Sequence, residues 1–472
     1  MLEHIKSRVG NSPDFVIKKM NICGKEIVIL FFETLTDTSN ISEFILKYLS
    51  YIKLNKKIII NFDEYIKKYI PSFKVVEIYS IDEIISSTYN GFIVLIIDDK
   101  YYSMEVRRAL DSGITKSENE KTIRGAKDAF SENYQTNIGL IRKRIRNESL
   151  WLEEVTLGKK SNTKIGIMYI NDIVNKRLLL KIKENINNIN IDSVLDSTYI
   201  YEYIKKNKSL FPNAIITERP DLASYKLLNG KVCIVVDNSP YVVLFPAFFM
   251  EFFHTMDDYY ENNVIASYIR IIRVIAFITT VILPGVYIAL ITYSYEIVPP
   301  TLLINFAIQK ENVPFPTIIE ALLMNTIFEI LHETDLRVPT SLGSALSIVG
   351  ALVLGDAAVS AGLVSPIMVI VIAITAISEL IFSINDVSNA SKIWRLIFIF
   401  LASISGIIGV FIGIILLISE LTSINSFGFP YMYPSSPLNK LDEENNIILT
   451  KKYKFKFRNK LTAYINSNRG EL

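Results

Sequence analysis

Short apolar runs alternate with amphipathic stretches over the first half of the chain. Runs of β-branched and other apolar residues predict strands, and apolar positions that recur every three or four residues predict helices. Strands are predicted at 25–32, 57–62, 73–80, 92–98, 163–170 and 214–218, a hairpin at 231–245, and helices at 41–52, 81–91, 175–189 and 193–207. Because this alternation occurs twice, the sequence predicts two α/β subdomains of similar construction, with sheets covered by helices.

The second half contains apolar runs long enough to cross a membrane. Residues 274–295 and 396–419 carry no charge, and each run exceeds the roughly 20 residues that a spanning helix needs. Residues 338–378 carry only Asp356, and Pro366 should divide them into a helical hairpin because proline disfavours helix in the residue before it. These runs predict four spans, near 274–294, 343–363, 366–383 and 396–419. The predicted fold class is therefore α/β followed by a helical transmembrane bundle.

Two further apolar segments leave alternatives open. Residues 242–253 are too few to span and are rich in phenylalanine, which favours an interfacial helix or belt. Residues 315–333 are nearly long enough, but Glu320 and Glu329 fall on opposite sides of a helix. That segment either lies at the membrane interface or spans only inside an assembly.

Positive charges near the spans predict the topology. Arg270 and Arg273 precede the first span, and the tail 451–460 is rich in lysine, so both flanks are expected on the cytoplasmic side. An even number of spans satisfies both. The alternating tail is expected to form a short strand or a membrane-surface element.

A polar connection joins the two predicted subdomains and ends in a basic helix at 132–147. Ile138, Ile141 and Ile145 form its apolar stripe. The remaining surface carries Arg142, Lys143, Arg144 and Arg146. This helix is either solvated on its basic side or contacts another subunit or anionic headgroups. The predicted division of the chain is 1–111 and 151–245 for the α/β subdomains, 112–150 for the connection, 246–424 for the membrane domain and 425–472 for a basic tail.

Composition narrows the classes of function. The chain has 472 residues, is 50% hydrophobic and carries a formal net charge of +2, which excludes a disordered chain and gives no nucleic-acid footprint. Cys23 and Cys233 both lie in apolar runs, so we expect small buried hydrophobes and no disulfide framework. Residues 1–20 lack the apolar run of a cleavable signal peptide. The motifs of common enzymes, metal sites and cofactor sites are missing, so we predict a protein without catalytic residues, metal or cofactor.

The predicted helix 343–363 carries the most informative pattern. Small residues recur on one face at alternating steps of three and four, which lets helices approach closely. The helix-packing residues expected on this face are Gly343, Ser347, Gly350, Ala357 and Ala361.

Asp356 lies on a different face of that helix, together with Val349, Leu352 and Ser360. An ionisable residue in an apolar span is costly unless it meets water or a partner. In a symmetric ring these residues would line an ion pathway, with Asp356 favouring cations and the two aliphatic residues forming a constriction. The alternative is that Asp356 bonds a hydroxyl on a neighbouring helix and is purely structural. Glu379 is expected to reach the interface.

Four stretches together resemble a known family. They are AFSENYQTNIGLIRKRIRN (129–147), TERPD (217–221), VPFPTIIEALLMNTIFEILHE (313–333) and SIVGALVLGDAAVSAGLVSPIMVIVIAITAI (347–377). They resemble the A subunits of spore germinant receptors, the GerA family, over about residues 110–434. Position 356 is commonly Glu or Gln in that family, so Asp356 is a departure. The proline-containing break that relatives usually have after the fourth apolar run is missing from 378–386.

The resemblance implies a receptor subunit of the inner spore membrane that acts with a transporter-like B subunit and a lipoprotein C subunit. It also implies an oligomeric ring with a central channel, with the 343–363 helix as the pore element and release of monovalent cations on germinant sensing. The leading hypothesis is therefore a germinant-gated cation-channel subunit. The alternative is a non-conducting scaffold that relays the signal. A substrate transporter is less favoured because paired broken helices and membrane repeats are missing.

Overall fold

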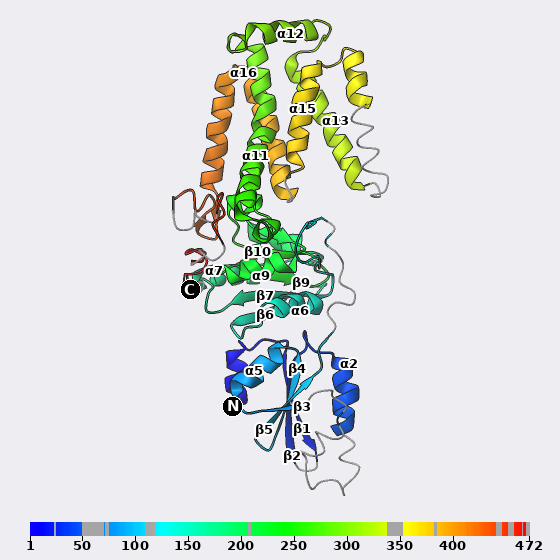
Figure 1. Ribbon diagram of the computed structural model, residues 1–472, viewed down its shortest axis with the longest axis vertical. Coiled ribbons are helices and arrows are strands. Elements are labelled where there is room, and N and C mark those ends of the chain that lie inside the picture. The colour runs from blue at the N-terminus through cyan, green and yellow to red at the C-terminus, as the bar shows by residue number, and fades with distance from the viewer. Residues whose placement is uncertain are drawn as a thin grey trace.

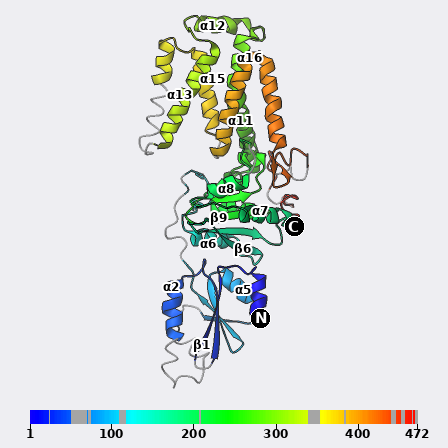
Figure 2. The same cartoon turned by 180° about the vertical axis from the view of Figure 1, so that it is seen from behind.

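The structure is a computed structural model that arranges two sheet domains and a helical bundle along one axis (Figure 1). It describes residues 1–22, 25–49, 70, 75–108, 117, 119–205, 209–337, 353–381, 385–439, 446–451, 457–464 and 466–468. The N-terminus lies beside the first sheet (Figures 1 and 2). The predicted strand 57–62, residue Cys23 and the first half of the predicted 343–363 helix fall outside the described residues.

The first sheet has the strand order β1-β2-β4-β5-β3, and every neighbouring pair is antiparallel. Its strands are β1 (Phe15–Ile22), β2 (Lys25–Phe32), β3 (Val75–Ile78), β4 (Phe92–Ile97) and β5 (Lys100–Glu105). Its helices are α1 (Leu2–Arg8), α2 (Thr38–Asn40) with η1 (Ile41–Leu46), and α5 (Ile81–Tyr89). The predicted strands 25–32, 73–80 and 92–98 and the helix 81–91 are confirmed. The strands β1 and β5 were not predicted, because they lack a continuous apolar run.

The second sheet repeats the first in its strand order, β6-β7-β9-β10-β8. Its strands are β6 (Leu150–Leu157), β7 (Thr163–Ile170), β8 (Ile215–Thr217), β9 (Val232–Val236) and β10 (Val242–Phe245). Its helices are α6 (Tyr134–Arg144), α7 (Lys176–Asn187), α8 (Ser197–Lys205) and α9 (Pro220–Leu228). In both sheets the fourth strand in the chain lies beside the second strand. The fourth and fifth strands then pair as a hairpin. The predicted similarity of the two subdomains is therefore present in their topology.

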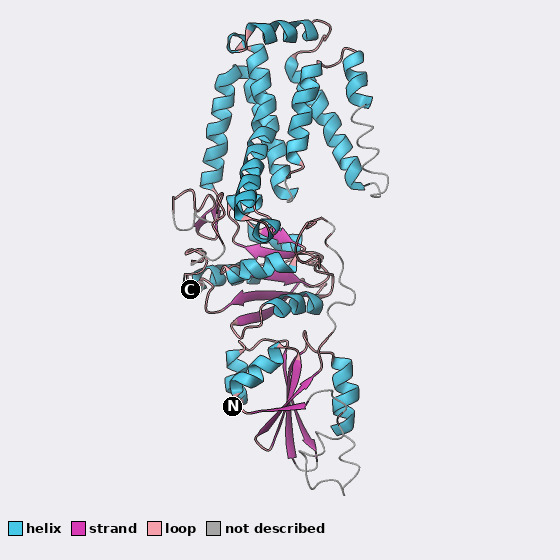
Figure 3. Cartoon of the chain, viewed as in Figure 1, coloured by secondary structure: helices cyan, strands magenta, loops and turns pink. Residues whose placement is uncertain are grey.

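Helices cover both faces of the second sheet (Figure 3). Ile165 and Ile167 of β7 pack with α7 and α8, whereas Met168 and Ile170 pack on the side of α6 and α9. Cys233 is buried on that second side, as predicted. Burial on both faces explains why antiparallel strands read here as continuous apolar runs, a pattern more usual in parallel sheets.

The segment 242–253 is not an interfacial belt, so that prediction is wrong. Its first four residues form β10, and the 3₁₀ helix η2 (Phe249–Phe253) follows with its phenylalanines buried. The rings of Phe249 and Phe253 lie 5.5 and 5.6 Å from that of Phe277 in the first long helix of the bundle. This aromatic cluster joins the second sheet domain to the bundle, and its phenylalanines are buried in that contact.

The bundle begins after α10 (Asp257–Tyr260). Its elements are α11 (Asn263–Thr292), η3 (Tyr295–Ile297), α12 (Pro300–Lys310), α13 (Thr317–Arg337), a helix over 353–360, α15 (Pro366–Glu379) and α16 (Asn385–Ser423). Among the described residues, two helical segments are long and apolar enough to cross a membrane. They are Asn263–Thr292 and Asp386–Ser423, the second of which is interrupted at Gly406. The helix α12 lies across the end of the bundle that is farthest from the sheets (Figure 1).

The last apolar run folds back on itself, which corrects the predicted single span at 396–419. Gly406 adopts φ +57° and ψ −135° inside α16, a backbone conformation that only glycine adopts readily. Trp394 Nε1 donates to Glu420 Oε2 at 2.9 Å, so the residues on either side of Gly406 lie antiparallel. The arms 385–405 and 407–423 measure about 30 and 25 Å at 1.5 Å per residue.

The predicted break before Pro366 is confirmed. Ser365 is the N-cap of α15, where its hydroxyl accepts from Met368 N, and Pro366 occupies the first turn. The helix over 353–360 packs on α15. Gly355 lies so close to Val369 that a Cβ added at Gly355 would be in van der Waals contact with Val369 Cγ1, at 3.6 Å.

The segment α13 packs along α15 (Figures 1 and 2). Glu320 accepts from Ser365 N at 2.8 Å, and Glu329 pairs with Lys392. Both carboxylates thus have partners inside the bundle, which favours the spanning alternative over an interfacial helix.

After α16 the chain returns to the second sheet domain through β11 (Asn425–Ser426) and β12 (Phe429–Pro430). Asn175 N donates to Thr462 O at 2.9 Å, and Arg458 Nε donates to Leu228 O at 2.9 Å. Residues 457–464 therefore contact the second sheet domain. Residues 452–456 of the predicted strand or membrane-surface element lie outside the described residues.

Candidate functional site

Asp356 lies on the outward face of the helix over 353–360. Its side chain is exposed, as are Ala357, Ser360 and Ala361, whereas Ala358 and Gly355 are buried against the bundle. Asp356 and Ser360 share a face, as predicted from the 100° helical step. Within one chain, the carboxylate and the small residues beside it point away from the neighbouring helices.

The remaining predicted residues of this helix lie outside the described residues. They are the pathway residues Val349 and Leu352 and the helix-packing residues Gly343, Ser347 and Gly350. The described part thus brings Asp356 and Ser360 together on a surface that the single chain leaves open.

Glu379, expected to reach the interface, is instead buried at the end of α15, with only 9% of its surface exposed. Arg395 Nη1 pairs with it at 2.9 Å, Lys392 Nζ lies 3.5 Å away, and the Ser388 hydroxyl donates to it at 2.7 Å. Burial is tolerated because two cations from the next helix neutralise the carboxylate. A cavity of about 180 Å³, lined mostly by apolar atoms, borders this cluster and includes His332.

Arg142 departs from the predicted solvated basic side of its helix, whereas Lys143 and Arg146 are exposed as expected. It is wholly buried, and its guanidinium binds both carboxylate oxygens of Asp14 at 2.8 and 2.9 Å. Ile138, Ile141 and Ile145 are buried as predicted. The cation therefore joins the first sheet domain to the second.

The cations before the first span are neutralised locally. Arg270 and Arg273 each lie 2.9 Å from Asp258, and Arg270 is almost completely buried. Nearby acids count little in the positive-inside rule, so this pairing leaves the prediction of a cytoplasmic N-terminal flank as it stands.

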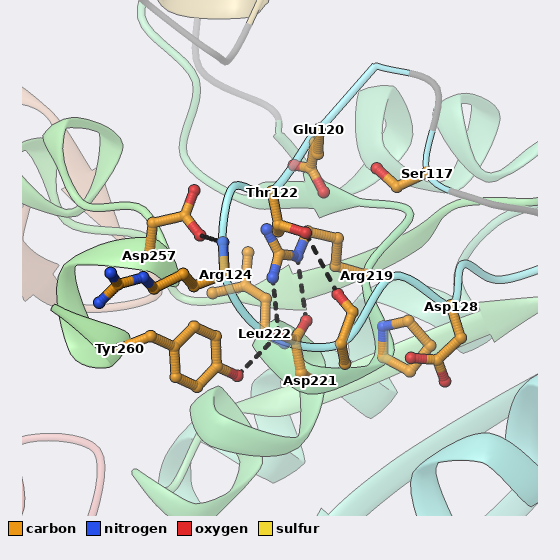
Figure 4. A network of polar contacts seen from close by, with 12 residues as sticks. Ser117, Glu120, Thr122, Arg124, Asp128, Arg219, Asp221, Leu222, Asp257 and Tyr260 are labelled. Carbon is orange, nitrogen blue, oxygen red and sulfur yellow. Dashed lines mark hydrogen bonds and ion pairs between the residues drawn. The ribbon is translucent and has the colours of Figure 1, made fainter.

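The motif 217–221 is the centre of a polar network between the connection and the base of the bundle (Figure 4). One oxygen of Glu218 accepts from the Ser117 hydroxyl at 2.6 Å and from the backbone N–H groups of Asn119 and Glu120 at 2.8 and 2.7 Å. A carboxylate that accepts several such bonds holds a loop firmly. We call residues 117–130 the strap.

The same motif also binds the segment that leads into α11. Arg219 pairs with both oxygens of Asp221 at 3.0 and 2.7 Å, and the Tyr260 hydroxyl donates to Asp221 at 2.9 Å. The strap reaches this segment too, because Arg124 lies 3.3 Å from Glu261. The strap, the motif and the base of the bundle therefore form one connected unit. The sequence pattern at 217–221 did not predict this role, because its partners lie far away in the chain.

Within the network, burial raises the pKa of Glu120 to about 7, against 4.5 for a free glutamate, although a hydrogen bond from Thr217 opposes the shift. The folded protein therefore binds this proton more tightly than the unfolded chain, so stability should fall as pH rises from 4.5 to 7. We expect Glu120→Gln to remove that slope in thermal unfolding between pH 5 and 8. An unchanged slope in Glu120→Gln would contradict the assignment, and Glu132→Gln, on an exposed side chain, is the control.

Comparisons with known proteins agree along nearly the whole chain. A family model described as Bacillus/Clostridium GerA spore germination protein matches residues 3–461. The chain is 36% identical over 443 residues to spore germination protein KA of Bacillus subtilis (strain 168), covering 92% of this chain and 81% of that protein. It is 38% identical over 344 residues to the uncharacterized membrane protein YfkQ of the same strain, covering 73% of this chain and 66% of that protein.

A solved structure is similar to the first half. It is the crystal structure of the N-terminal domain of the A subunit of the Bacillus megaterium spore germinant receptor GerK3. The sequence identity is 30%, the TM-score is 0.41, and the match covers 52% of this chain and 94% of that chain.

Proposed function

Because the chain belongs to the GerA family of spore germination proteins, we propose that it is the A subunit of a nutrient-sensing germinant receptor and that several copies of it form a germinant-gated cation channel. The family membership carries the first part of the proposal. The second part rests on one observation, the outward exposure of Asp356.

An aspartate on the outer face of an apolar helix needs water or a partner. Asp356 precedes the turn at Gly362 by six residues, or about 9 Å at 1.5 Å per residue, which is inside a hydrocarbon core of about 30 Å. An ionised side chain facing lipid at that depth costs several kcal/mol. Copies of the chain arranged around a central axis remove that cost, because the carboxylates then face a hydrated path.

The neighbours of Asp356 suit such an arrangement. Ala357 and Ala361 are small and exposed on the adjoining face of the helix, so adjacent copies can approach closely there. A ring of Asp356 carboxylates attracts cations, and Ser360 supplies a hydroxyl on the same face. In this proposal Val349 and Leu352 form the narrow apolar part of the path, while Gly343, Ser347 and Gly350 extend the packing surface.

The proposed setting is the inner membrane of the spore, with the sheet domains on the cytoplasmic side. A transporter-like B subunit and a lipoprotein C subunit complete the receptor, with the germinant bound on another chain. The described helices support an even number of crossings, because α11 leaves the second sheet domain and the chain returns to the same domain after α16 (Figure 1).

The test is cation flux, after addition of the germinant, through liposomes that hold the chain together with the B and C subunits. We expect Asp356→Asn to lower potassium flux about tenfold or more and to reduce selectivity for cations over anions, because the ring loses its charge. Asp192→Asn makes the same chemical change on an exposed loop of the soluble domain and should leave flux unchanged. Equal flux and selectivity in Asp356→Asn and the parent chain would instead favour the non-conducting scaffold.

A further inference from the structure

The start of α11 carries apolar side chains that the single chain leaves exposed. The helix has 30 residues, which measure about 45 Å at 1.5 Å per residue, whereas a hydrocarbon core is about 30 Å thick. Because α12 lies across the outer end of the bundle (Figure 1), about ten residues at the start of α11 extend out of the core toward the sheets. Val264, Ile265 and Tyr268 lie in this part, and each is more than 50% exposed.

The exposed side chains of α11 follow the spacing of a helix-packing seam. They recur at alternating steps of four and three residues and are between 41 and 70% exposed: Val264, Tyr268, Ile271, Ile275 and Ile278. The other side of the helix is buried within the chain, as Ala266 and Arg270 are. Apolar residues at this spacing are typical of a face that packs against another helix. We call Val264, Tyr268 and Ile271 the lower seam.

The lower seam lies outside the region that lipid covers. On the buried side of the same turns, Arg270 pairs with Asp258 of α10 at 2.9 Å. Leu449 N, in the segment that follows the bundle, donates to Ser267 Oγ at 2.9 Å. These contacts place the start of α11 among polar elements at the base of the bundle. An apolar stripe exposed to water is typical of an interaction surface, so we expect protein to cover the lower seam.

A second exposed stripe lies on α8. Tyr199 and Tyr203 are four residues apart on one face of this helix and are 39 and 49% exposed, whereas Ile204 is buried against the sheet. Shortly after α8, Ser209 Oγ donates to Glu420 Oε1 of α16 at 2.8 Å. The end of α8 therefore lies at the base of the bundle, as the lower seam does.

The two stripes belong to opposite sides of the chain. The helix α11 runs in front of the first arm of α16 in Figure 1 and behind it in Figure 2. In contrast, α8 covers the face of the second sheet that is turned to the viewer in Figure 2. The helix over 353–360, which carries Asp356, lies at one edge of the bundle in both views. A subunit of a ring has this arrangement, with one side toward the axis and two different sides toward its neighbours.

We propose that the lower seam of one copy packs against Tyr199 and Tyr203 of the next copy. The proposal rests on the proposed assembly of several copies around an axis, and it adds the surfaces through which they touch. The lower seam extends about 10 Å along α11, and α8 measures about 13 Å, so the two stripes match in length. Tyrosine suits such a contact, because its ring is buried while its hydroxyl reaches water at the rim.

Photo-crosslinking of the full chain, assembled with the B and C subunits in vesicles, tests the proposal. With p-benzoylphenylalanine in place of Tyr268, we expect an adduct of twice the mass of the chain, which mass spectrometry maps to residues 195–205 of the second copy. The same probe in place of Tyr203 should give the reciprocal adduct at residues 263–275. Tyr79 is the matched control, because it is an exposed tyrosine on the first sheet domain, and its adducts should map to neither stripe.

A charge placed in the lower seam should weaken the contact. With the probe in place of Tyr203, Ile271→Lys should lower the yield of the adduct at least fivefold, whereas Tyr79→Lys should leave it unchanged. Equal yields in Ile271→Lys and the parent chain would overturn the proposal. Adducts formed only with lipid, with a different subunit or with other residues of a second copy would overturn it as well.

The flux measurement separates this interface from the proposed ion path. Loss of the adduct together with flux that still depends on Asp356 removes the interface alone. An adduct that persists while flux is the same in Asp356→Asn and the parent chain supports the interface and removes the ion path alone.

Discussion

The Arg142→Met variant is expected to lose about 3 to 5 kcal/mol of the free energy of unfolding, because it leaves Asp14 as an unpaired buried carboxylate. The guanidinium also donates to Leu150 O at 3.2 Å and to Ser12 Oγ at 3.1 Å. It lies 4.5 Å from the centroid of the Phe32 ring, which adds a cation–π contact. Methionine fills similar space but replaces none of these polar contacts.

The loss should appear at the contact between the two sheet domains. Asp14 directly precedes β1, and Leu150 is the first residue of β6, so Arg142 joins the edge of one sheet to the edge of the other. Chemical denaturation of the full chain in detergent, followed by circular dichroism, measures the change. The parent chain is the reference, and the first domain should unfold at lower denaturant in the variant.

Two further variants make this test specific. Arg146→Met lies on the exposed side of the same segment and should change stability by less than about 0.5 kcal/mol. The double variant Asp14→Asn, Arg142→Met removes the orphaned charge and should recover part of the loss. A loss below about 1 kcal/mol in Arg142→Met, or no recovery in the double variant, would contradict the role assigned to this pair.

Elements that depend on neighbours in the sequence were predictable. The hairpin at 231–245 and the break before Pro366 were both found, because turn and cap chemistry is local. The duplicated α/β architecture was likewise visible in the alternation of runs. The antiparallel pairing within each sheet could not be predicted. Strands buried on both faces give the same continuous apolar pattern whether they run parallel or antiparallel.

The burial of two charged side chains could not be predicted, because each depends on a partner that is distant in the sequence. A helical projection treats Arg142, Lys143 and Arg144 as equivalent cations, yet only Arg142 meets Asp14, which is 128 residues away. In the same way Glu379 appeared free to reach the interface, but the cations that bury it lie on the next helix. Charge alone therefore predicted exposure where a specific counter-ion produced burial.

The hairpin in α16 was also missed, although a signal was present. Hydropathy measures the length of an apolar run but does not detect a reversal inside it. Gly406, Gly409 and Gly413 lie at steps of three and four, and the structure uses all three. Gly406 makes the turn, while the other two let the returning arm approach Leu401 and Phe398.

Replacing Gly409 by leucine is therefore expected to cost about 3 kcal/mol or more, at or above the usual range for overpacking. A Cβ at this position would lie 2.0 Å from Leu401 O and 2.5 Å from Leu401 C, so the two arms touch through their backbones. No change of rotamer relieves a clash with backbone, and the arms must separate. Thermal unfolding of the purified chain measures the loss, and Ile408→Leu introduces the same residue at an exposed neighbouring position as the control.

The reversal makes a second measurement decisive. In a hairpin, both ends of α16 lie on one side of the membrane, whereas an uninterrupted span places them on opposite sides. In a background where Cys23 and Cys233 are replaced by serine, cysteines at Asn389 and Thr422 should react with an impermeant maleimide from the same side of a vesicle. Labelling from opposite sides, together with equal melting temperatures for Gly409→Leu and Ile408→Leu, would show that the two arms do not pack and that the run is a single span.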